Sequence, residues 1–218
     1  MKLGYCPIGN GNSVAPFNRV FSEKQDISIS LDGVDAVVFW GGTDISPTLY
    51  NHDFHPFSQA SRGGLSNRDM FEWQAMKYCK LNNIPMIGVC RGAQMLCAFA
   101  GGYLIQHVNN HGTDHEMTTS DGQVMRTTSC HHQMMYPYNI PHEILAWSTE
   151  KLSKTYEGEV GEDLSDRMIS RVEPEVVYFP TVKGLAIQGH PEWAIGSEFA
   201  EYCNNLIREK LFNTVLES

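Results

Sequence analysis

Cys90 is the residue whose sequence surroundings point most directly to chemistry. It follows an apolar run at 84–89 and lies between Gly88 and Gly92, in a Gly-x-Cys-x-Gly pattern. This is the cysteine form of the nucleophile elbow, a strained strand-to-helix turn in which larger flanking side chains would collide. Such a turn lifts the sulfur above the carboxyl edge of the sheet, where the positive end of the following helix favours the thiolate. We therefore predict that Cys90 is a nucleophile with a lowered pKa.

A nucleophilic thiol needs a base, and His190 has the most suitable sequence context for that role. It closes the run GLAIQGH at 184–190, whose pattern indicates a strand, and Pro191 and Glu192 follow it. Alternate residues of an extended segment point the same way, so Glu192 can reach the imidazole and fix its tautomer. We predict a triad in which Cys90 attacks, His190 moves the proton and Glu192 orients His190.

Acyl chemistry also requires hydrogen-bond donors for the oxyanion that develops on the substrate. The backbone N–H of Arg91, at the start of the helix after the elbow, is one predicted donor. The backbone N–H of Gly42 is the other, because the apolar run at 34–40 leads straight into Gly41-Gly42 and a bare backbone can approach a substrate oxygen closely.

The order of the surrounding elements predicts how these residues come together. Strand–helix alternation of this kind favours one α/β domain over residues 1–218, an open and mostly parallel sheet with helices on both faces. Asn67 is expected to cap the first helix, and Arg68, Asp69 and Glu72 form either a charge network or a solvated helix start. Strands are predicted at 1–6, 34–40, 84–89, 172–180 and 183–190, and helices at 68–83, 91–102 and 196–216.

The overall composition excludes several classes of partner. Lys and Arg number 16 against 25 Asp and Glu, which gives a net charge of −9, and no basic cluster interrupts it. An acidic surface repels a phosphate backbone, so no nucleic acid is expected. No segment has the roughly 18 apolar residues of a membrane helix, and the N-terminus lacks the apolar core of a signal peptide, so a cytoplasmic protein with no membrane partner is expected. Six cysteines are then expected as free thiols.

Several segments, taken together, resemble a known superfamily. GVCRGAQML (88–96), GHPE (189–192) and the Gly-Gly after a strand are similar to the nucleophile, His–Glu and oxyanion motifs of the class I glutamine amidotransferases. The closer resemblance is to the γ-glutamyl hydrolases of peptidase family C26, above all the γ-glutamyl-γ-aminobutyrate hydrolase branch. It is carried by WGGTDISPTLY (40–50), NRDMFE (67–72), CRGAQML (90–96), AGGYLIQHV (100–108) and SCHHQ (129–133).

The resemblance implies a flavodoxin-like fold, a chemistry and a set of substrate contacts. The substrate would be a small γ-glutamyl molecule, cleaved through a covalent γ-glutamyl thioester on Cys90 with no cofactor. Gln94 would contact the glutamyl group. A loop containing Ser129, His131 and His132 would lie near its α-carboxylate and α-amine. Met134-Met135 follow this loop where smaller residues are usual, so the amine that leaves stays undetermined.

Alternatives remain at this stage. The chain is either a stand-alone hydrolase or a glutaminase subunit that passes ammonia to a separate synthetase chain, and a homodimer is compatible with both. A catalytically inactive binding module and a cysteine peptidase or chaperone-like hydrolase are the other classes weighed. His107, His111 and His115 have the spacing of a helical zinc site, but Asn109, Asn110 and Gly112 argue against a helix, so no metal is expected.

Overall fold

The structure is a computed structural model that describes residues 1–7 and 15–214. A nine-stranded sheet crosses it, in the order β2-β1-β3-β4-β13-β12-β10-β7-β8. The first five strands in that order pair in parallel, and the others pair antiparallel. The parallel strands are β1 (Lys2–Tyr5), β2 (Glu23–Asp26), β3 (Ala36–Phe39), β4 (Met86–Val89) and β13 (Gly184–Ile187). The antiparallel strands are β12 (Pro174–Phe179), β10 (Glu143–Ser148), β7 (His115–Thr119) and β8 (Val124–Thr127).

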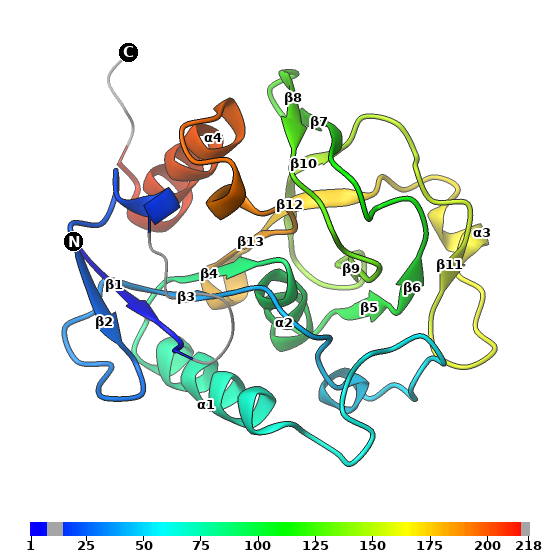
Figure 1. Cartoon of the computed structure of the whole chain (residues 1–218), viewed down its shortest axis with the longest axis horizontal. Coiled ribbons are helices and arrows are strands. Elements are labelled where there is room, and N and C mark those ends of the chain that lie inside the picture. The colour runs from blue at the N-terminus through cyan, green and yellow to red at the C-terminus, as the bar shows by residue number, and fades with distance from the viewer. Residues whose placement is uncertain (8–14, 215–218) are drawn as a thin grey trace.

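Helices cover both faces of the sheet, as the sequence predicts. Helices α1 (Asn67–Leu81) and α2 (Arg91–Phe99) pack on one face, and α4 (Glu198–Leu206), extended by a π-helical turn at Ile207–Leu211, packs on the other (Figure 1). The period-2 alternation of strands explains this two-sided core. In β3, Val38 packs toward the α4 side, whereas Val37 packs toward the α1 and α2 side.

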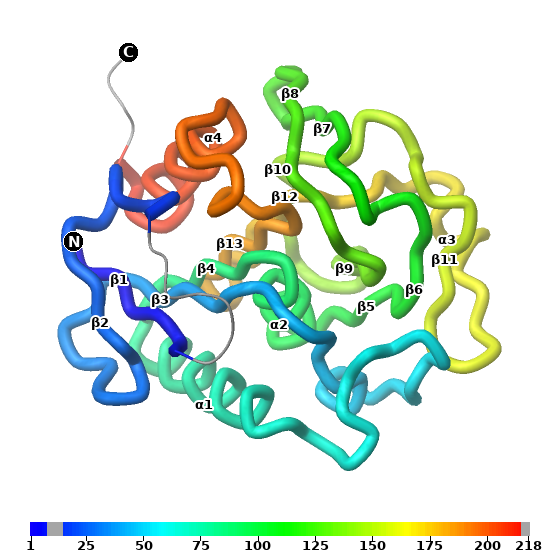
Figure 2. Tube along the Cα trace, in the orientation of Figure 1, coloured from blue at the N-terminus to red at the C-terminus, as the bar shows by residue number. Residues whose placement is uncertain are grey.

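The antiparallel half forms the opposite end of the molecule from the N-terminal strands (Figure 2). Two small two-stranded sheets and a short helix adjoin it. They are β5 (Tyr103–Ile105) with β9 (Met134–Tyr136), β6 (His107–Val108) with β11 (Tyr156–Glu157), and α3 (Ser165–Met168). A third core cluster lies among these elements.

Three neighbouring parallel strands determine where the site forms. Strand β4 lies between β3 and β13, with Gly88 opposite Phe39 and Val89 opposite Ile187. Parallel strands end at the same edge of a sheet, so the segments that follow these three strands come together there. These segments contain Gly42, Cys90 and His190.

The predicted boundaries differ from the structure at a few points. Ser66, not Asn67, is the N-cap of α1, in a capping box with Asp69, because its hydroxyl accepts the Asp69 N–H. The last helix begins at Glu198, after the N-cap Ser197. Strand β2 was not predicted, since its polar sequence EKQD carries no apolar alternation. Within the described ranges, every helix is too short or too polar to cross a bilayer.

Candidate active site

The elbow at Cys90 has the strained geometry that its glycines predict. Cys90 has φ 51° and ψ −106°, directly after β4 and before the first residue of α2. A side chain at Gly92 would collide with the Phe39 carbonyl, and one at Gly88 would collide with the backbone of Gly92. Positive φ costs a cysteine conformational energy, so the surrounding backbone must impose this conformation. The Cys90 N–H donates to the Ile187 carbonyl at 2.8 Å, which ties the elbow to β13.

His190 and Glu192 form the predicted pair. The Nδ1 atom of His190 lies 2.7 Å from the Glu192 carboxylate, so the proton carried at Nδ1 is donated to Glu192. The indole of Trp193 stacks on the imidazole, with ring centroids 3.7 Å apart and planes 2° from parallel. Burial alone would lower the pKa of His190, but hydrogen bonds with Cys130 and Glu192 outweigh it and raise this pKa to about 9.

A second thiol, Cys130, adjoins Cys90 and His190. Its Sγ lies 3.3 Å from Nε2 of His190, and a reactive atom from each of Cys90, Cys130 and His190 lies within 4.8 Å of the other two. Sequence reasoning missed Cys130, although it occurs inside the segment SCHHQ that carried part of the resemblance. Both thiols are free, and Cys130 is exposed whereas Cys90 is buried.

Cys130 changes the expected charge state of the site. Its hydrogen bond with Cys90, together with burial, raises the pKa of Cys90 well above its usual range, and only the N–H of Arg91 opposes this. Hydrogen bonds with Cys90 and His190 lower the pKa of Cys130 to about 5. The prediction of a lowered Cys90 pKa is therefore wrong for this arrangement, because the neighbouring sulfur takes the negative charge.

The two predicted oxyanion donors lie beside the thiol. The Arg91 N–H begins α2 and interacts with the Cys90 sulfur, and Gly42 lines the same cavity as Cys90. Gly42 has φ +148°, and a side chain there would collide with the Arg68 guanidinium. Only glycine therefore fits this position, and its backbone stays open to the cavity.

Four charged side chains, three of them buried, link the segment at Trp40 and Gly41 to the elbow. Arg91 bonds Asp69 at 2.6 Å and also contacts Glu72, and Arg68 bonds Glu72 at 2.9 Å. Arg68 also donates to the carbonyls of Trp40 at 2.8 Å and Gly41 at 3.0 Å. The sequence left open a charge network or a solvated helix start, and the structure shows the network, with the side chain of Arg91 as a member that the sequence did not suggest.

The predicted substrate-binding residues fall into two groups. Gln94, His131 and His132 line a cavity of about 240 Å³ that also contains Cys90, His190 and Gly42. Ser129 is not among its lining residues, because its hydroxyl donates instead to the His111 carbonyl at 2.6 Å. The prediction of a direct substrate contact for Ser129 is thus not supported, and this residue holds the loop in place.

The cavity wall has two polar features that sequence reasoning did not assign. Asp44 lies 3.2 Å from Nε2 of His132, and this contact raises the pKa of His132. The Gln133 carbonyl accepts a hydrogen bond from Gln94 at 3.1 Å, while its side-chain Oε1 is buried without a partner. The wall thus offers an acidic group, a basic group and an unused acceptor close together.

Comparisons with known proteins identify the family of the chain and several relatives. The Peptidase C26 family profile matches residues 13–159. Gamma-glutamyl-CDP-amidate hydrolase of Campylobacter jejuni is 32% identical to this chain over 96 residues, which cover 44% of this chain and 42% of that protein. The glutamine amidotransferase-like YvdE homolog of Lactococcus lactis is 40% identical over 103 residues, which cover 47% of this chain and 50% of that protein. The chain spans half or less of the length of the curated relatives it matches.

A solved structure supports the fold independently. A glutamine amidotransferase from Thermotoga maritima superposes with a TM-score of 0.55 at 14% identity, over 100% of this chain and 99% of that one. The predicted flavodoxin-like class I glutamine amidotransferase fold is thereby confirmed. Since the family profile covers well over half of the sequence, the chain belongs to the Peptidase C26 family.

Proposed function

We propose that the chain is a cysteine-dependent amidohydrolase that cleaves the γ-glutamyl C–N bond of glutamine or a γ-glutamyl amide. The observation that carries this proposal is one cavity lined by Cys90, His190 and Gly42, with the Arg91 N–H at the Cys90 sulfur. A thiol on a strained elbow, a carboxylate-bound imidazole and two amide donors are the components of acyl transfer by a cysteine.

The chemical steps follow from the positions of these groups. The Cys90 sulfur attacks the γ-carbonyl carbon, and the oxygen of that carbonyl takes up negative charge between the two amides. Collapse of this intermediate breaks the C–N bond, His190 gives its proton to the departing nitrogen, and a γ-glutamyl thioester remains on Cys90. Water then attacks the thioester, His190 takes the proton from that water, and glutamate leaves with the Cys90 thiolate restored.

The proton that Cys90 must lose has an acceptor beside it. Cys90 and Cys130 share a hydrogen bond, and Cys130 in turn contacts His190 at 3.3 Å. Transfer of the Cys90 proton to Cys130 leaves the Cys90 thiolate next to the protonated imidazole, which is the arrangement that attack requires.

The cavity wall supports a glutamyl head group as the bound part of the substrate. That group carries an α-carboxylate and an α-ammonium, and the wall offers His132, Asp44 and the buried Oε1 of Gln133. The imidazole of His132 complements the carboxylate, and the Asp44 and Gln133 oxygens complement the ammonium. Family membership and the similarity to a protein named gamma-glutamyl-CDP-amidate hydrolase support the same substrate class.

The test is a substrate panel of glutamine, γ-glutamyl amines and γ-glutamyl peptides, with free glutamate as the readout. We expect turnover of at least one γ-glutamyl amide by the isolated chain, and a loss of several orders of magnitude in Cys90→Ser and His190→Ala. Cys203→Ala, which alters a buried cysteine of α4 outside the cavity, is the matched control and should keep its activity.

Two outcomes would change the assignment. Undiminished turnover by Cys90→Ser would contradict the proposal. Glutamine cleavage that stays nearly absent until a separate synthetase chain is added would favour a glutaminase subunit over a stand-alone hydrolase.

A further inference from the structure

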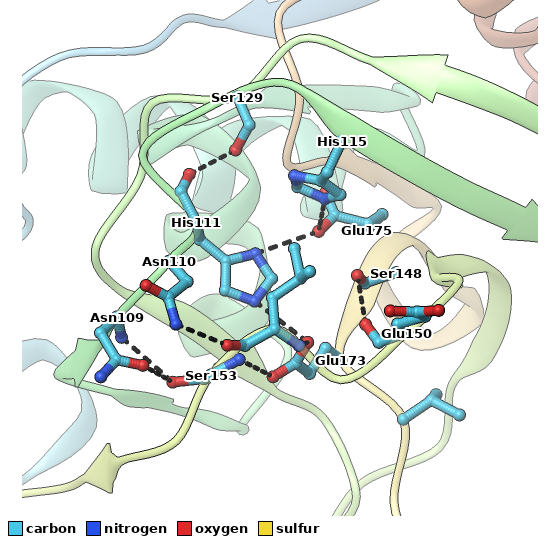
Figure 3. Close-up of polar contacts among 12 residues, drawn as sticks. Asn109, Asn110, His111, His115, Ser129, Ser148, Glu150, Ser153, Glu173 and Glu175 are labelled. Carbon is cyan, nitrogen blue, oxygen red and sulfur yellow. Dashed lines mark hydrogen bonds and ion pairs between the residues drawn. The ribbon is translucent and has the colours of Figure 1, made fainter.

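Three histidines from two segments converge on one buried glutamate in the antiparallel half of the molecule. From Oε1 of Glu175, on β12, the distances are 3.0 Å to Nε2 of His115, 3.5 Å to Nδ1 of His111 and 3.9 Å to Nε2 of His131. His111 and Glu175 are 0% and 1% exposed, and His131 is 4% exposed. Figure 3 shows His111 and His115 turned toward Glu175, with Glu173 on the other side of His111.

The second ring nitrogen of each histidine faces a hydrogen-bond acceptor. Nδ1 of His131 lies 2.9 Å from the Gln133 carbonyl, and Nδ1 of His115 lies 3.0 Å from the Thr113 carbonyl. Nε2 of His111 lies 3.2 Å from the Glu173 carboxylate. These acceptors hold a proton on the nitrogen that faces them, so in neutral His111 and His131 rings the nitrogens nearer Glu175 present lone pairs. Nε2 of His115, in contrast, lies at hydrogen-bond distance from Glu175, 3.0 Å away, and can donate to it.

Lone pairs that face a buried carboxylate repel it unless a ring proton or a metal cation lies between them. Nε2 of His131 and Oε2 of Glu175 are both buried and have no hydrogen-bond partner. Donor atoms of His111, His131 and Glu175 all lie within 4.8 Å of one another. A tetrahedral ion with bonds of about 2.0–2.1 Å needs ligand atoms about 3.4 Å apart, which is close to the 3.5 and 3.9 Å separations from Glu175 to His111 and His131.

We propose that His111, His131 and Glu175 bind a divalent transition-metal ion of the zinc class. Two imidazoles and a carboxylate are borderline ligands that suit such an ion. Glu173 then holds the His111 ring from outside, as carboxylates do behind zinc-bound histidines, and His115 holds the Glu175 carboxylate. The sequence did not predict this set, because its members come from three segments and not from one helix, and His107 is not part of it.

The site would hold the active-site loop in place and would take no part in the reaction. It joins the loop before β7, strand β12 and the loop that carries Cys130 and His132 beside the cavity. The hydroxyl of Ser129 donates to the His111 carbonyl, and its N–H donates to Asp114 at 3.1 Å, so the same two loops are already bonded to each other. A metal at this point fixes the loop whatever substrate the enzyme takes.

The test must separate this site from the thiols of the cavity, since Cys90, Cys130 and His190 also form a group able to bind zinc. The full-length Cys90→Ser/Cys130→Ser protein is freed of metal with a chelator and titrated with Zn²⁺ by calorimetry. A parallel titration with Co²⁺ is followed by visible absorption. We expect one Zn²⁺ per chain, a nitrogen- and oxygen-ligated Co²⁺ spectrum, and a thermal midpoint that rises with Zn²⁺ concentration.

Variants in the same background locate the ion. His131→Gln and Glu175→Gln should abolish saturable binding, and Glu173→Gln should weaken it by roughly 10- to 100-fold. His142→Gln, which changes a histidine whose ring bonds only its own loop and an aromatic neighbour, should bind Zn²⁺ like the parent. Circular dichroism of the metal-free proteins checks that each variant is folded.

Either of two results would overturn the proposal. One is the absence of stoichiometric Zn²⁺ binding in the Cys90→Ser/Cys130→Ser parent, which would mean that the protonated His111 ring bridges the two glutamates without a metal. This result would overturn the proposal even if the His131 and Glu175 variants failed to fold, because it is measured on the parent protein. The other is unchanged Zn²⁺ binding by folded His131→Gln. Neither depends on amidohydrolase activity.

Discussion

Removal of one charge from the network behind the elbow should cost far more stability than the same change in a surface ion pair. The Glu72 carboxylate is 0% exposed and pairs with Arg91 and Arg68, whose side chains are 2% and 13% exposed. The pair Arg19–Glu201 has a similar contact, at 2.5 Å, but its side chains are 66% and 32% exposed. The two glutamates therefore differ chiefly in burial, and Glu201→Gln is the matched control for Glu72→Gln.

The loss of unfolding free energy in Glu72→Gln depends on which partners the guanidinium groups of Arg91 and Arg68 keep. Loss of one partner of a buried ion pair typically costs about 3–5 kcal/mol, because a charge remains in a medium of low dielectric. Arg91 retains Asp69, and Arg68 retains two carbonyl acceptors, so the lower end of that range, about 3 kcal/mol, is expected for Glu72→Gln. For Glu201→Gln the expected cost is below about 1 kcal/mol.

Urea unfolding at pH 7 measures both free energies of unfolding, and calorimetry should show a midpoint about 6–12 °C lower for Glu72→Gln. The same variant should lose activity beyond its loss of folded protein, because Arg68, without the Glu72 carboxylate to orient it, holds the carbonyls of Trp40 and Gly41 next to Gly42 less rigidly. Equal destabilisation by Glu72→Gln and Glu201→Gln would refute the claim that burial makes this network structural.

Two further predictions concern the histidine and the elbow. The His190 pKa is raised from 6.5 to about 9, so the stabilisation from its hydrogen bonds is full below about pH 6.5 and is lost as the pH rises through 9. The stability difference between wild type and Glu192→Gln should therefore shrink between pH 5.5 and pH 10 in urea titrations, and a constant difference would contradict the pairing. Gly92→Ala should destabilise by roughly 1–3 kcal/mol, because its Cβ collides with the Phe39 carbonyl. Gly63→Ala, whose Cβ makes only an ordinary contact with the Ser61 hydroxyl at 3.8 Å, should stay within about 0.5 kcal/mol. Equal values in thermal unfolding would mean that the elbow tolerates a larger residue.

Local sequence signals predicted the parts of the site that local geometry determines. Cys90 between two glycines, His190 two residues before Glu192, and Gly42 after an apolar strand each follow from one short segment. Their convergence followed from parallel strands ending at one edge. The family resemblance added Gln94, His131 and His132, which the structure places around the same cavity.

The features that sequence reasoning missed depend on contacts between distant segments. Cys130 reaches His190 across 60 positions, and the Arg91 side chain reaches Asp69 across 22. The histidine–glutamate cluster likewise assembles from three separate segments. No periodicity or spacing encodes such contacts, since they depend on how loops pack after the sheet has formed. The hydrogen bond of the Ser129 hydroxyl is a contact of the same kind, because it reaches a carbonyl 18 positions away.

The identity of the sulfur that carries the acyl group is the most direct test of the central claim. Wild-type protein is mixed with a γ-glutamyl amide, quenched in acid during turnover, digested with trypsin and analysed by mass spectrometry. Cleavage after lysine and arginine separates the two thiols, with Cys90 in the peptide 81–91 and Cys130 in the peptide 127–151. We predict one γ-glutamyl group on the peptide that contains Cys90. The same group on the Cys130 peptide, or turnover with neither peptide modified under conditions that trap a thioester, would contradict the account.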